Sequence, residues 1–88
     1  MKQRLTFHAD PAHGWLEVTR ADLEALNIAH KISRYSYASG TKVFLEEDSD
    51  ANHYLQAAKG RDWTINIEEK FTNGDSFIRN LPRFETGF

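Results

Sequence analysis

The sequence predicts an α+β fold in which a mainly antiparallel sheet of five strands carries two short helices on one face. Segments with apolar residues at every second position, which are typical of strands, occur in pairs joined by short turn sequences. Two other segments have the apolar spacing of a helix. The expected order is ββαββαβ. The chain has 88 residues and is 40% hydrophobic, enough for one core. We therefore expect a single domain over residues 1–71 and an irregular tail over 72–88, docked on the domain or on a partner.

The first two strands form a hairpin over residues 3–18. Apolar and polar residues alternate in "RLTFHA" and again in "GWLEVT". Between them, Asp10 before Pro11 favours a turn, and Gly14 tolerates the backbone angles that turns require. The alternation in the second strand places Trp15 on the face opposite Leu16.

A short helix and a second hairpin follow. In "TRADLEALNI", Thr19 is a suitable N-cap, and Leu23 and Leu26 form the buried stripe. The run "KISRYSYASGTKVFLEE", residues 31–47, has strand-forming residues on both sides of Ser39-Gly40. With those two residues as the loop, the two strands of the hairpin pair so that Tyr35 lies opposite Phe44.

The second helix spans "DSDANHYLQAAKG", where Asp48, Ser49 or Asp50 can act as the cap and Gly60 ends the helix. The fifth strand is "WTINIEEKF", with alternating Trp63 and isoleucines. The tail "TNGDSFIRNLPRFETGF" has no periodicity, but its three phenylalanines predict that it packs against something.

Composition excludes several classes of function. The chain has no cysteine, so disulfides, thiolate metal sites and cysteine nucleophiles are absent. The net charge of −2 argues against nucleic acid as the main partner. No apolar run has the length of a signal peptide or of a membrane span, which is ~20 residues, so we expect a cytoplasmic protein.

The histidines of "FHADPAHG" are the first candidate site. Imidazole and carboxylate are zinc ligands, so His8, Asp10 and His13 could hold a catalytic metal. The proline and glycine in this stretch exclude the helical spacing that brings close ligands together. A turn in which Asp10 bonds to the following backbone is the favoured interpretation, with no metal and no cofactor expected.

Two other groups of residues are candidates for binding. The acidic run of residues 46–50 suits the start of a helix, where the backbone carries partial positive charge, and it also offers an acidic surface. Aromatic side chains near arginines on a sheet are typical of interfaces. The predicted binding residues are Arg34, Tyr35, Tyr37, Phe44, Glu46, Glu47, Asp48, Asp50, Arg79 and Arg83.

The stretches "HADPAHGWLEV", "KISRYSY" and "VFLEEDSDA", together with the ending "IRNLPRF", resemble a group of small bacteriophage and prophage proteins of uncharacterised activity. The similar stretches cover most of residues 7–51 and part of the tail. The resemblance implies an accessory protein made in the cytoplasm of a bacterial host. Small phage proteins of this kind often bind and block a host factor, including defence systems such as CRISPR–Cas. No functional residue carries over from the group.

We therefore expect a protein that works by protein–protein binding rather than catalysis, with a host protein or complex as its partner. Free sheet edges also leave a homodimer open. Two other functions are compatible with the sequence. One is a small metal-dependent hydrolase or nuclease that uses the histidines and aspartate above. The other is a sheet that binds single-stranded nucleic acid.

Overall fold

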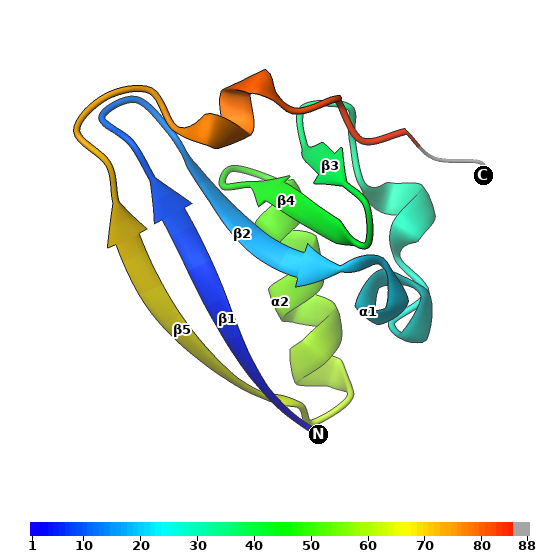
Figure 1. The fold of residues 1–88 in the computed structure, drawn as a ribbon. Helices are drawn as coiled ribbons and strands as arrows, with labels where there is room; N and C mark the ends of the chain where they lie inside the picture. The colour runs from blue at the N-terminus through cyan, green and yellow to red at the C-terminus, as the bar shows by residue number, and fades with distance from the viewer. Residues whose placement is uncertain (86–88) are drawn as a thin grey trace.

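The fold is a five-stranded sheet with helices on one face and the C-terminal tail on the other, as seen in a computed structural model that describes residues 1–85 (Figure 1). Residues 86–88 of the predicted tail lie outside the described residues. The strands are β1 (Lys2–Ala9), β2 (Gly14–Thr19), β3 (Tyr37–Ser39), β4 (Lys42–Glu46) and β5 (Thr64–Phe71). The helices are α1 (Arg20–Ala25) and α2 (Asp50–Gly60), with two 3-10 helices, η1 (Ala29–Lys31) and η2 (Phe77–Asn80).

The sheet is mixed, so the prediction of a mainly antiparallel sheet was wrong. Its order is β3-β4-β2-β1-β5, and β5 runs parallel to β1 with Lys2 opposite Thr64 and Ala9 opposite Phe71. The parallel pairing results from the connection through α2. This helix carries the chain back along the sheet after β4, so β5 runs in the direction of β4, which is also that of β1. The observed element order also differs from the expected one, because η1 lies between α1 and β3 and η2 follows β5 in the segment expected to be irregular.

The second hairpin has a different register from the predicted one. Its loop is Gly40-Thr41, with φ of 60° at Gly40, and Tyr37 rather than Tyr35 lies opposite Phe44. Residues 31–36 do not extend the strand, because η1 and a turn occupy this segment. The serines of this turn, Ser33 and Ser36, donate hydrogen bonds to Asp50 at the start of α2, so the turn is held against the helix.

Other local predictions are confirmed. The first hairpin forms over β1 and β2. Helix α1 begins where Thr19 accepts a hydrogen bond from the N–H of Asp22, and Asn27 follows it with φ of 56°. Helix α2 ends at Gly60 as expected.

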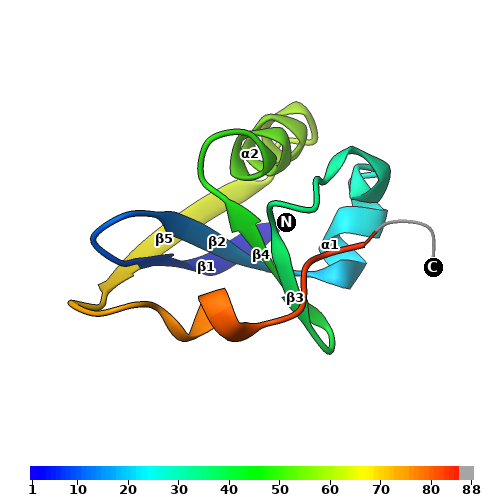
Figure 2. The same ribbon diagram turned by 90° about the horizontal axis from the view of Figure 1, so that it is seen from above.

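The main core lies between the sheet and the two helices. Leu16, Val18 and Leu45 of the sheet pack with Leu23 of α1 and Tyr54 of α2. A second, smaller core lies on the opposite face, where Trp15 and Phe44 are covered by Ile78 of η2. Figure 2 shows α2 and η2 on opposite sides of the sheet. Both helices, α1 and α2, are too short and too polar to cross a membrane within the described chain.

The tail begins after β5, crosses the face of the sheet opposite the helices and reaches β3. The N–H of Ala38 donates to the carbonyl of Pro82 at 2.9 Å, and the N–H of Phe84 donates to the carbonyl of Ser36 at 2.8 Å. Phe84 itself is buried in the main core. The tail thus covers the outer edge of β3.

Candidate binding pocket

A pocket of about 480 Å³ lies where β2, β4 and the start of α2 meet the tail. We name it the binding pocket. Its floor and walls are formed by His13, Gly14, Trp15, Tyr35, Tyr37, Glu46, Glu47, Asp48, Ser49, Arg79 and Arg83. Seven of the ten residues predicted to bind a partner are in this set, although they come from three separate segments of the chain.

Two aromatic rings in contact with each other form the floor, and each is covered by one arginine. The rings of Trp15 and Tyr37 meet edge to face with centroids 6.2 Å apart. The guanidinium of Arg79 lies 5.3 Å from the centroid of Trp15, and that of Arg83 lies 4.6 Å from the centroid of Tyr37. These cation–π contacts fix both arginines over the sheet. Tyr35 is different, because 74% of it is exposed.

Asp10 holds Arg79 in place, and this contact gives the aspartate of the "HADPAH" stretch a structural role. Its carboxylate accepts from Nε of Arg79 at 2.7 Å and from Nη2 at 3.0 Å. The same carboxylate accepts from the backbone N–H groups of Ala12, His13 and Ser76. The bond from Arg79, and next the bond from the Ser76 N–H, hold the pKa of Asp10 far below its usual range. Asp10 therefore closes the β1–β2 turn and fastens the tail to it.

Glu46, at the end of β4, anchors the acidic side of the pocket. Its carboxylate accepts from the backbone N–H groups of Asp48, Ser49 and Asp50 at 2.9, 2.7 and 2.8 Å. Burial alone would raise the pKa of Glu46, but these N–H groups outweigh it and hold the pKa below its usual value. The start of α2 is thus capped by a side chain from the preceding strand, not by Asp48, Ser49 or Asp50 as the sequence suggested.

Glu47 and Asp48 form an acidic rim. Both side chains are exposed. Nδ1 of the His13 ring lies 3.6 Å from Oε1 of Glu47. On the opposite side of the pocket, Arg83 is exposed and its Nη1 donates to the carbonyl of Arg34 at 3.3 Å. The pocket therefore has carboxylates on one side, a guanidinium on the other and aromatic rings between them.

Three predicted binding residues lie outside the pocket. Arg34 is exposed next to it, with its Nη2 3.5 Å from a carboxylate oxygen of Glu85. Phe44 is only 3% exposed, because η2 covers it. Asp50 is buried and accepts bonds from Ser33 and Ser36, so it holds the preceding loop against α2. Phe44 and Asp50 are not accessible to a partner.

His8, Asp10 and His13 do not converge. Nε2 of His8 lies 2.8 Å from Oε1 of Glu17, Asp10 is engaged by Arg79, and His13 lies beside Glu47. Burial would raise the pKa of Glu17, but hydrogen bonds from His8 and Lys42 hold it below its usual value. Within residues 1–85, no group of three or more His, Cys, Asp or Glu residues is arranged to hold a metal ion.

Trp15 is the main pocket residue that the sequence reasoning missed. Alternation placed it on the face away from Leu16, which is correct. What made it part of a pocket is its register with Glu46, its neighbour on β4. That register brings the aromatic floor next to the acidic side, and only the pairing of β2 with β4 could reveal it. Gly14 lies beside it in a tight space, because a Cβ there would come within 2.4 Å of the Phe7 ring.

The pocket combines aromatic rings with charged groups, a composition that is common in binding sites. An aromatic floor supplies contact area, and a few charged groups around it set orientation. No protein-family model, curated protein or solved structure matches the chain. Function is therefore inferred from the pocket itself.

Proposed function

We propose that this chain is a non-enzymatic accessory protein of phage or mobile-element type, which captures a bacterial host protein or complex through the binding pocket. The observation that carries the proposal is the meeting of the predicted aromatic, acidic and basic residues in one hollow. The resemblance of several stretches to small phage proteins supplies the setting, a bacterial cytoplasm. Inhibition of a host defence factor such as CRISPR–Cas is the process that this setting favours.

The exposure of the pocket walls supports a macromolecular partner over a small ligand. Tyr35 is 74% exposed, and the side chains of Glu47 and Arg83 also project into solvent. Small-molecule sites bury most of their ligand, and walls of this kind do not enclose one. A protein surface laid across the pocket would cover them, and exposed tyrosines and arginines are the side chains most often found at the centre of such interfaces.

The charges of the pocket define the chemistry of the partner surface. Arg79 is paired with Asp10, so the exposed charges on the pocket walls are the carboxylates of Glu47 and Asp48 and the guanidinium of Arg83. The two carboxylates outnumber the guanidinium. The partner should therefore present a basic side chain to the acidic rim and a hydrogen-bond acceptor to Arg83.

The test is quantitative pulldown from bacterial cytosol with variants of exposed residues. Tyr35→Ala and Asp48→Lys should each reduce capture of one host protein at least tenfold, because each removes a pocket contact without touching the core. Matched controls are Phe77→Ala, which removes another exposed aromatic side chain, and Glu24→Lys, which reverses another exposed acid. Both controls should capture the same protein as well as wild type.

Capture that is equal for wild type and for both pocket variants would contradict the proposal. Tyr37 is not used, because its ring packs against Trp15 and Arg83 and its loss would disturb the pocket itself.

A further inference from the structure

The two edges of the sheet are treated differently by the fold. The edge formed by β3 is covered by residues 82–84 of the tail. The other edge is β5, an eight-residue strand that pairs with β1 on one side only. Within residues 1–85, no strand lies on its outer side. A long free edge of this kind is a template for pairing with another chain.

The outward-pointing backbone groups of β5 can be identified from its ladder. The N–H of Thr64 donates to the carbonyl of Met1, and the N–H of Thr72 donates to the carbonyl of Ala9, both at 2.9 Å. In a parallel ladder, alternate residues bond to the same neighbour. Even-numbered residues of β5 therefore face β1, and the backbone groups of Ile65, Ile67, Glu69 and Phe71 point outward.

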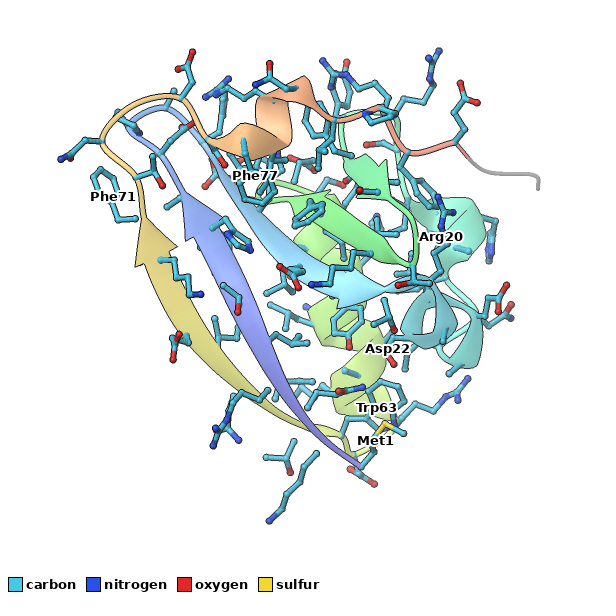
Figure 3. The ribbon with its side chains drawn as sticks, viewed as in Figure 1. Met1, Arg20, Asp22, Trp63, Phe71 and Phe77 are labelled. Carbon is cyan, nitrogen blue, oxygen red and sulfur yellow. The ribbon has the colours of Figure 1, made fainter. Side chains whose placement is uncertain are left out.

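The same odd-numbered residues place apolar side chains on the helix side of the edge. Ile67 is 49% exposed and Phe71 is 62% exposed. Figure 3 shows Phe71 at the end of β5, projecting away from the sheet. Ile67 also borders a hollow of about 420 Å³ between β5 and α2, whose apolar lining includes Phe7 and Leu55. The edge thus has both free backbone groups and uncovered apolar surface.

We propose that β5 pairs antiparallel with β5 of a second copy of this chain, about a two-fold axis at Glu69. In this register Ile67 lies opposite Phe71 of the second copy, and Lys70 lies opposite Glu68 of the second copy. The two-fold axis generates each contact twice. Both kinds of pair are stabilising across strands. Ile67 and Phe71 pair a β-branched with an aromatic side chain, and Lys70 and Glu68 pair a positive with a negative charge.

Neighbouring registers that keep the outward groups paired are less complementary. With the axis at Glu68, that residue opposes itself and Ile67 opposes Glu69. With the axis at Ile67, Glu69 opposes Ile65 and no ion pair forms. The register centred on Glu69 has one unfavourable contact, between the two Glu69 carboxylates at the axis. Glu69→Gln should therefore tighten the dimer by up to about fivefold.

The pairing can be tested with charge-reversal variants, whose dimer dissociation constants are measured by sedimentation equilibrium. Lys70→Glu alone places carboxylates opposite each other twice and should weaken the dimer at least threefold. The double variant Lys70→Glu/Glu68→Lys restores both ion pairs in reversed order and should restore the wild-type dissociation constant. Lys59→Glu, an exposed change on α2, is the matched control and should leave it unchanged. A wild-type chain that stays monomeric at ~1 mM, or a double variant as weak as the single one, would overturn the proposal.

A second measurement fixes the register. Because the chain has no cysteine, single-cysteine variants react at one site. Glu69→Cys should be joined to itself by a short bis-maleimide reagent, because the two positions face each other at the axis. Thr64→Cys should not, because the two copies of position 64 would be ~33 Å apart at about 3.3 Å per residue. Joining through position 64 but not through position 69 would overturn the register.

Discussion

At the scale of single residues, Asp10 connects the two ends of the chain. It accepts two hydrogen bonds from Arg79 and three from backbone N–H groups in the β1–β2 turn and at the start of η2. Arg79 in turn covers Trp15 on the floor of the binding pocket. One carboxylate therefore sets both the course of the tail and the position of a pocket residue.

Replacement of Asp10 by asparagine should destabilise the fold. Asp10→Asn removes the negative charge and leaves the Arg79 guanidinium without its partner, so the melting temperature should fall by several degrees. Asp75→Asn is the matched control, because Asp75 also lies near Arg79 but is 91% exposed and 3.9 Å away. It should leave the melting temperature unchanged. Equal melting temperatures for wild type and Asp10→Asn, measured by circular dichroism, would show that the contact does not hold the tail.

The same contact predicts how stability depends on pH. The pKa of Asp10 is lowered in the folded state by Arg79 and the Ser76 N–H. Its contribution to the free energy of unfolding is complete above the unfolded pKa of about 3.9 and is lost as the pH falls further. Urea midpoints of wild type should thus drop more steeply between about pH 5 and pH 2 than those of Asp10→Asn. Parallel curves would contradict this assignment.

At the scale of elements, α2 begins where Glu46 of β4 caps it. Glu46→Ala removes the acceptor for three N–H groups and should lower the free energy of unfolding by about 1–2 kcal/mol. Glu47→Ala is the matched control, because Glu47 is the next residue but its side chain is exposed. Its effect should stay within about 0.5 kcal/mol. Urea denaturation measures both, and a larger loss for Glu47→Ala would contradict the capping role.

The tail is an integral part of the fold, so its phenylalanines should contribute to stability according to how deeply each is buried. Phe84 is 3% exposed and belongs to the main core, whereas Phe77 of η2 is 56% exposed. Phe84→Ala should lower the free energy of unfolding by about 3–5 kcal/mol because it leaves a cavity. Phe77→Ala should cost less than about 1 kcal/mol. Similar losses for the two variants would mean that the tail does not pack as described.

At the scale of the whole molecule, the sequence predicted features that depend on near neighbours. The first hairpin follows from alternation on both sides of Pro11, and α1 follows from the Thr19 cap and its leucine stripe. Strand β5 was placed correctly along the chain, but its parallel pairing with β1 was not predicted. That pairing joins residues about sixty positions apart, and periodicity within a strand carries no information about its neighbour.

The same limit applies to the pocket. The aromatic, acidic and arginine residues were predicted from their chemistry, but their assembly depends on the Asp10–Arg79 contact and on the register of β2 with β4. The second hairpin shows how strongly the pocket depends on strand pairing. The loop lies at Gly40-Thr41 instead of Ser39-Gly40, and β3 begins only at Tyr37. Tyr35 therefore lies outside the sheet, where it is the most exposed aromatic residue of the pocket.

Site-specific photo-crosslinking can test whether a host protein occupies the binding pocket. A photoreactive phenylalanine analogue is introduced at position 35, inside the pocket, or at position 77, an exposed aromatic position outside it. After irradiation in bacterial cells, we predict one host protein crosslinked through position 35 and not through position 77, and lost when Asp48→Lys is added. Crosslinking through position 77 alone, or through neither position, would show that the pocket does not capture a host protein.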